Sequence, residues 1–151
     1  MYRLVAIVMT LLTAVTEAKP VLTVTCSEPT GHRYDYVQGS IESSTDGFSG
    51  VNPVFVVDDE KPKKLLVIWG PANPARALGF ERRANEATII SATPDKITAV
   101  RIDDANSGVV HMYSLYPVKG LVFFTQHRYL NFSGGQPNSA TYYVRCTFTP
   151  S

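Results

Sequence analysis

The sequence has little charge imbalance, few cysteines and almost no helical periodicity. Its 14 lysines and arginines nearly cancel its 13 aspartates and glutamates, which leaves a formal net charge of +1. A balance of this kind predicts no electrostatic attraction to nucleic acid or to an anionic membrane. The sequence also lacks repeats and low-complexity tracts, and its apolar content is that of an ordinary globular domain.

Long apolar runs are confined to the amino terminus, which reads MYRLVAIVMTLLTAVTEAKP. Arg3 precedes an uncharged apolar segment from Leu4 to Val15, and small residues follow, as in a secretory signal. The segment is shorter than the about 20 residues that span a bilayer. We therefore predict a signal peptide over residues 1–18 and a single all-β domain over 19–151. The mature protein should be soluble, periplasmic or secreted, and without stable membrane insertion.

Only two cysteines are present, Cys26 near the start of the predicted mature domain and Cys146 near its end. In an oxidising compartment, two cysteines more often pair than stay free. Neither thiol has a histidine or a third cysteine at ligand spacing, so no metal site is expected there. We predict a disulfide between them, which would close a loop of about 120 residues.

After the predicted signal, prolines and glycines interrupt a series of short segments that are rich in β-branched and aromatic residues. This spacing is typical of an all-β sandwich or barrel. The last five segments follow one another through polar turns and predict an antiparallel meander. The expected strands are Val21–Cys26, Arg33–Val37, Val54–Val57, Lys64–Trp69, Thr88–Ala92, Lys96–Ile102, Val109–Tyr116, Leu121–Tyr129 and Ala140–Phe148.

A disulfide between the first and last of these strands requires the two strands to be neighbours. Bonded cysteines have Cα atoms within about 7 Å of each other. In a meander, adjacent first and last strands mean that the sheet closes on itself. We therefore expect a single antiparallel meander that closes as a small barrel, with a β-sandwich as the alternative.

The segment HMYSLYPVKGLVFFTQHRY, from His111 to Tyr129, predicts a central β-hairpin. A four-residue turn that begins at Pro117 suits the fixed φ of proline and places His111 opposite Gln126. A three-residue turn would instead place His111 opposite His127, where the two imidazoles could share a metal or a proton. The proline favours the four-residue turn. No metal site is therefore expected, and His111 and His127 are candidates only in the other register.

In either register, both faces of this hairpin are apolar near its centre. A sheet with one face in water normally alternates, so a loop, a partner or a ligand should cover the second face. Core packing is the commonest role of such aromatic residues, and an apolar pocket is the alternative. The long segment from Gly70 to Ala87 is a further candidate surface. For a pocket, the candidate ligand-binding residues are Trp69, Tyr113, Tyr116, Phe123 and Tyr142.

Patterns that indicate catalysis are missing from the sequence. The nearest match to a nucleophile elbow, Gly47-Phe48-Ser49-Gly50, has the wrong spacing and no helical pattern after it. The acidic residues of Asp58–Glu60 and Asp103–Asp104 are neighbours at turns, whereas acid and base chemistry needs two carboxyl groups that face across a cleft. We therefore predict no catalytic residue and no cofactor.

Four stretches, DGFSGVNPVFVVDD, LLVIWG, LYPVKGLVFFTQHRY and ATYYVRC, resemble small exported bacterial β-rich proteins with no assigned activity. The resemblance covers most of the mature domain and implies no catalytic residues. The sequence thus indicates a non-catalytic binding or interaction protein, for an unknown protein or a small apolar ligand. The alternatives are a small hydrolase or metal-dependent enzyme that uses His111 and His127, and a structural component of the cell envelope.

Overall fold

The computed structural model describes residues 20–71, 83–103, 108–130 and 136–150. Ten strands make up most of these residues, and they form one antiparallel sheet. The strands are β1 (Pro20–Cys26), β2 (Thr30–Val37), β3 (Ser40–Gly47), β4 (Val51–Asp58), β5 (Lys64–Pro71), β6 (Arg83–Ala92), β7 (Ile97–Asp103), β8 (Val109–Tyr116), β9 (Leu121–Leu130) and β10 (Gln136–Pro150).

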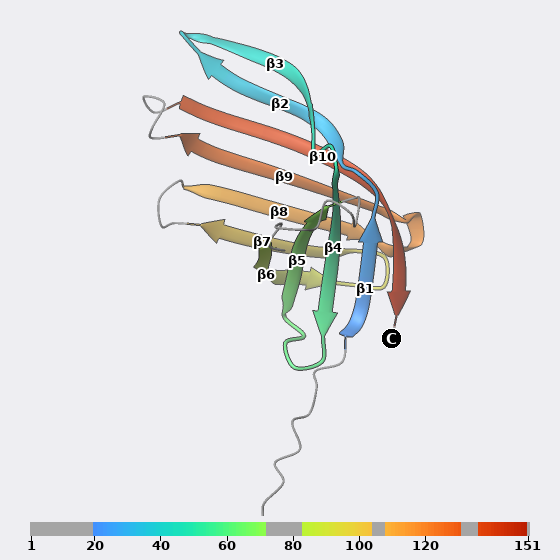
Figure 1. The fold of residues 1–151 in the computed structure, drawn as a ribbon. Helices are drawn as coiled ribbons and strands as arrows, with labels where there is room; N and C mark the ends of the chain where they lie inside the picture. Colours follow the sequence, from blue (N-terminus) through green and yellow to red (C-terminus); the bar gives the residue numbers. More distant parts are fainter. Residues whose placement is uncertain (1–19, 72–82, 104–107, 131–135, 151) are drawn as a thin grey trace, which may run out of the picture.

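The sheet closes into a barrel because β1 pairs with both β4 and β10. Eight strands form the barrel, in the order β1, β4, β5, β6, β7, β8, β9 and β10. The long strand β10 also pairs with β2 through Asn138–Tyr143, so the β2–β3 hairpin continues the sheet beyond the barrel. Figure 1 shows this hairpin lying beside β10, away from β5 and β6. The predicted barrel is therefore confirmed.

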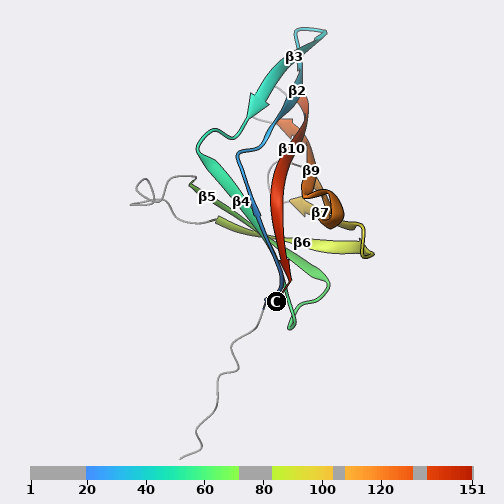
Figure 2. The same ribbon diagram turned by 90° about the vertical axis from the view of Figure 1, so that its right-hand side faces the viewer.

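Two groups of strands cross in this barrel. In Figure 1, β4 and β5 run steeply across the direction of β7 to β10, and Figure 2 shows β6 lying across the direction of β10. Strand β6 belongs to both groups, because Arg83–Thr88 pairs with β5 and Thr88–Ala92 pairs with β7. A register shift between Ile89 and Ser91 marks the bend. Before Thr88, β6 and β7 are no longer paired, and the barrel opens at this end.

The disulfide joins the two strands that close the barrel. Cys26 and Cys146 are register partners of β1 and β10, with Cα atoms 4.0 Å apart. The bond therefore covers the seam where the start and the end of the chain meet. Bridged cysteines are consistent with folding in an oxidising compartment.

Alternation along each strand places one set of side chains inside the barrel. The largest wholly buried side chains are aromatic or branched, and small alanines on β6, β7 and β10 leave room for them. The core consists of Val24, Cys26, Phe55, Val57, Leu65, Val67, Ala87, Ala99, Tyr113, Leu115, Val122, Phe124, Ala140, Tyr142 and Val144.

The turn between β8 and β9 has the four-residue form that the sequence favoured. Tyr116 lies opposite Leu121, and the residues between them form a short 3-10 turn, Pro117–Lys119, that ends at Gly120. Gly120 has a φ of 58°, in the left-handed region that glycine adopts without strain. Its N–H donates a hydrogen bond to the carbonyl of Pro117 at 3.2 Å. The meander predicted for the second half of the chain, β6 to β10, is also confirmed.

One strand was not predicted, and several strands extend beyond their predicted bounds. Residues 40–47 form β3, which was not among the expected strands. Strand β6 begins at Arg83, inside the long segment that the sequence left without regular structure. Pairing with β2 and β5 supplies backbone partners there, which outweighs the low strand propensity of the side chains.

Some predictions fall on other parts of the chain. The signal peptide predicted over residues 1–18 lies outside the described residues, as does most of the long segment after Gly70. Within the described ranges, no helix has the length and apolar character needed to cross a membrane.

Candidate functional site

A pocket of about 290 Å³ lies where β6 and β7 diverge. The β3–β4 connection and the six strands from β4 to β9 contribute to its wall, so the barrel itself surrounds the pocket. The lining residues are Phe48, Val51, Trp69, Asn85, Arg101, His111, Phe124 and Gln126.

Aromatic rings form the apolar side of this pocket. Phe48 stacks on Trp69 with ring centroids 5.1 Å apart, and Trp69 meets Phe124 edge to face at 5.5 Å. Tyr142 packs behind them, 4.9 Å from Phe48 and 4.8 Å from Phe124. These four rings come from four separate segments of the chain and form one cluster, which we call the aromatic floor.

The β3–β4 connection brings Phe48 into the aromatic floor. The N–H of Phe48 donates to the carbonyl of Pro29 at 3.1 Å, and its own carbonyl accepts from the N–H of Val51 at 3.1 Å. Gly50, with a φ of 75°, completes the turn. The Gly-Phe-Ser-Gly stretch thus positions an aromatic ring over the barrel interior, a role that the sequence analysis did not identify.

Polar side chains form the opposite side of the pocket. Arg101, His111 and Gln126 are register partners across β7, β8 and β9, so they point to the same face of the sheet. Asn85 of β6 approaches from across the opening. The pocket therefore combines an aromatic floor with a short row of hydrogen-bonding groups, the usual composition of a small-molecule site.

His111 is neutral at physiological pH. Burial lowers its pKa to about 4, and the positive charges of Arg101 and Arg128 act in the same direction, against a smaller opposite effect of Asp103. Its ring lies nearly parallel to that of Tyr113, at 6.1 Å. The neutral imidazole has one N–H donor and one acceptor nitrogen that can face a ligand.

Tyr113 lies directly behind His111 and is completely buried. Its hydroxyl has no hydrogen-bond partner among the residues that the structure describes. Burial raises the pKa of this phenol to about 12, and the charge of Arg101 acts weakly against that change. The hydroxyl is therefore a protonated donor within the electrostatic reach of Arg101.

A chain of hydrogen bonds continues the polar row toward the β2–β3 hairpin. Gln126 donates to the Tyr142 hydroxyl at 3.3 Å, and that hydroxyl donates to Asp46 at 2.7 Å. Arg33 also pairs with Asp46, at 3.8 Å, and donates to Asp35 at 2.7 Å. The last residue of this series of hydrogen bonds is Asn138, which donates to Asp35 and accepts from Arg128. In this network Arg33 is paired with carboxylates, whereas Arg128 bonds to the neutral amide of Asn138.

The five predicted ligand-binding residues fall into two groups. Trp69 lines the pocket, and Tyr142 and Tyr113 pack against its wall. Tyr116 and Phe123 point to the outside of the barrel, where their rings contact each other at 6.1 Å. Phe123 is 39% exposed there. The structure thus brings three of the five residues together and separates the other two from them by the thickness of the sheet.

The two candidate metal-binding histidines also lie on opposite faces. His111 is opposite Gln126, whereas His127 is opposite Val110 on the outer face. The register that would have placed the two imidazoles face to face is not formed. Among the described residues, no group of three histidine, cysteine or acidic side chains could hold a metal ion.

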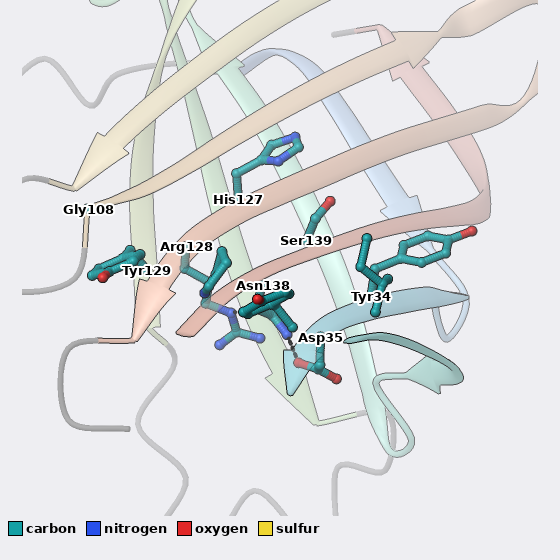
Figure 3. A pocket seen from close by; sticks show the side chains of 11 residues that line it. Tyr34, Asp35, Gly108, His127, Arg128, Tyr129, Asn138 and Ser139 are labelled. Atoms are coloured by element: carbon teal, nitrogen blue, oxygen red, sulfur yellow. Dashed lines mark hydrogen bonds between the residues drawn. The ribbon is translucent and has the colours of Figure 1, made fainter. Parts of the chain in front are cut away.

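A larger groove, of about 410 Å³, lies across β2, β9 and β10, and its lining residues come from both faces of the sheet. Exposed tyrosines at positions 34, 36 and 129 line it together with His127 and Ile41. Figure 3 shows Tyr34 and Tyr129 on either side of His127, Arg128, Ser139 and Asn138, with the hydrogen bond between Asn138 and Asp35 below. Because most of its lining residues are exposed, this groove encloses a ligand less than the pocket inside the barrel does.

Asn85, Arg101 and Gln126 were not predicted as site residues. Gln126 and Arg101 follow the period-two alternation of their strands, so the register of the β7–β8–β9 sheet would have placed them beside His111. Asn85 had no such signal, because it lies in the segment for which no strand was expected.

Comparison with protein-family models and with curated protein sequences finds no match for this chain. The site is therefore interpreted from its own geometry.

Proposed function

We propose that this protein is a non-catalytic binding protein that holds a small, mainly apolar ligand in the pocket between the aromatic floor and the polar row. The observation that carries this proposal is the enclosure of Trp69, Phe48 and Phe124 beside Arg101 and His111 in one pocket of about 290 Å³. Since a water molecule takes about 30 Å³ of liquid volume, the pocket has room for a ligand of roughly ten water-sized groups.

The same proposal includes an exported location. The sequence favours the periplasm or the outside of a bacterial cell, and the disulfide between Cys26 and Cys146 is compatible with either compartment. A protein in that setting meets small organic molecules directly. Its barrel would bind them without chemical change.

Trp69 provides a direct test, because it is the single tryptophan of the chain and lines the pocket. We expect 3-phenylpropanamide, a neutral single-ring compound, to change the emission of Trp69 in a saturable manner. Isothermal titration calorimetry should give the same dissociation constant as the fluorescence titration. A titration with no saturable change in either signal would contradict the proposal.

Two variants separate the pocket from the outer face. Val51→Phe adds a ring to the pocket wall and should abolish binding, because the added volume occupies the space of the ligand. Phe123→Ser changes an exposed ring on the outer face and should leave binding unchanged. If Phe123→Ser abolished binding and Val51→Phe did not, the outer face would be the binding surface instead.

A further inference from the structure

Among the described residues that line the pocket, Arg101 is the one with a formal charge, and none carries a carboxylate. Its other lining groups are aromatic, aliphatic, amide or imidazole side chains. A positive charge at the wall of an otherwise uncharged pocket favours a ligand that carries a negative charge at the matching point. The charge distribution therefore restricts which small molecules the pocket takes.

Arg101 is held in place and keeps donors for a ligand. One terminal nitrogen of its guanidinium donates to Asp103 at 2.7 Å. In the described part of the chain this is the single hydrogen bond of the Arg101 side chain, and a guanidinium has five N–H donors. Asp103 is not among the described lining residues, so its contact holds one nitrogen of the guanidinium and leaves the other donors available to a ligand.

Among the described residues, the charges that act on His111 are positive on balance. At His111, the charges of Arg101 and Arg128 both act to lower the pKa, and of the nearby carboxylates Asp103 alone opposes them. Arg128 has Asn138, a neutral amide, as its hydrogen-bond partner. An anionic group beside His111 would therefore meet an attractive potential.

Two uncharged donors lie near the same point. The imidazole of His111 faces the pocket and makes no hydrogen bond to any described residue. The Tyr113 hydroxyl behind it is buried and unpartnered within the same ranges. Tyr113 is not among the described lining residues, so His111 is the one of these two donors that faces a ligand in the pocket.

We propose that the ligand is a small organic acid whose carboxylate binds Arg101 and His111 while its apolar part lies on the aromatic floor. This inference rests on the proposed function, because it assigns a chemical class to the ligand of the same pocket. The planar guanidinium can hold a carboxylate through two parallel hydrogen bonds. The ring or chain of the acid would then extend toward Trp69 and Phe48, the apolar side of the pocket.

A pair of matched compounds tests this inference. 3-Phenylpropanoate carries the carboxylate, and 3-phenylpropanamide has nearly the same shape without the charge. We expect the acid to bind at least tenfold more tightly than the amide at pH 7 and low salt, because charge-assisted hydrogen bonds are stronger than neutral ones. Trp69 emission and calorimetry measure both dissociation constants.

Variants of Arg101 test whether this residue causes the preference for the acid over the amide. Arg101→Gln should remove the preference for the acid over the amide, and Arg101→Lys should keep part of that preference. Arg145→Gln, which removes an exposed arginine on the outside of the barrel, is the matched control and should retain the full preference.

The outcomes are distinguishable. If the amide binds as tightly as the acid, or if the preference survives in Arg101→Gln, the carboxylate inference is wrong and the proposed function stands. If neither compound binds, both fail. Circular dichroism of Arg101→Gln shows whether the barrel is intact, and binding of the amide by this variant confirms that the pocket has formed.

Discussion

The hydroxyl of Tyr142 donates a 2.7 Å hydrogen bond to Asp46, which ties the barrel strand β10 to the edge strand β3. The same hydroxyl accepts a bond from Gln126 at the pocket wall. Burial raises the pKa of Tyr142 above its ordinary range, and the bond to Asp46 acts in the same direction. One phenol therefore connects the pocket, the barrel and the hairpin beyond it.

We expect Tyr142→Phe to lower the free energy of unfolding by about 1–3 kcal/mol, because Gln126 and Asp46 both lose a partner. Tyr143→Phe is the matched control, since its side chain points outward and is 51% exposed. That change should alter stability by less than about 0.5 kcal/mol. Urea denaturation of both variants measures the difference, and equal losses would show that the Tyr142 hydroxyl contributes nothing.

Gly31 permits the close approach of β2 to β10. A Cβ atom at this position would lie 2.8 Å from the Cα of Tyr142, inside the distance that real Cβ atoms keep. Gly31→Ala should therefore cost about 3 kcal/mol or more, because backbone atoms have to move. Gly50→Ala, where the Cβ would meet no atom within 4 Å, should cost only the about 1–2 kcal/mol of its left-handed backbone. Thermal denaturation that ranks Gly50→Ala as the more damaging change would contradict this explanation.

The disulfide stabilises the barrel by restricting the unfolded chain. It joins cysteines separated by 120 residues in sequence, for which the chain-entropy model gives at most about 4–5 kcal/mol. The double variant Cys26→Ala/Cys146→Ala should therefore unfold at a markedly lower urea concentration. Its midpoint should not respond to a reducing agent, whereas that of the wild type should fall. A fully reduced wild type with an unchanged midpoint would disprove the stabilisation.

Stability should decrease in mild acid through His111. The pKa of this residue is near 6.5 in an unfolded chain and about 4 in the folded protein, so the unfolded state binds the proton more strongly between these values. The contribution of His111 is thus fully present above pH 6.5 and is lost as the pH falls toward 4. Partial solvent screening reduces it to roughly 1–2 kcal/mol.

Urea denaturation at pH 7 and pH 4.5 measures this contribution. His111→Gln should lose less stability between the two pH values than the wild type does, because glutamine takes up no proton. His127→Gln, on the outer face, is the control and should behave as the wild type. The same pH dependence in His111→Gln and in the wild type would assign the acid sensitivity to other groups.

Much of the architecture was predictable from local features. Two cysteines near the ends of a chain of short β-rich segments require adjacent terminal strands, and in a meander that adjacency produces a closed barrel. Pro117 and Gly120 determine the β8–β9 turn, because each suits one position of a four-residue reversal. The register of that hairpin followed from the turn, and with it the separation of His111 from His127.

The site was predictable only in part. Trp69, Tyr113 and Tyr142 were predicted as site residues because they are aromatic. Tyr116 and Phe123 were predicted for the same reason, but they lie on the other face of the sheet. Composition does not distinguish the two faces of a strand, because successive side chains alternate between them. Phe48 was missed for a related reason: its position depends on a bond to Pro29, which lies in another part of the chain.

The all-β class, the pairing of the two cysteines and the tight turn after Tyr116 follow from local sequence features, since each depends on residues with strong local preferences. The divergence of β6 from β7, the pairing of β2 with β10 and the position of Arg101 opposite the aromatic floor depend on the tertiary structure. The physical reason is that a barrel brings together strands far apart in the chain. Which side chains then meet is set by strand register and crossing across the whole sheet, and no short segment encodes that information.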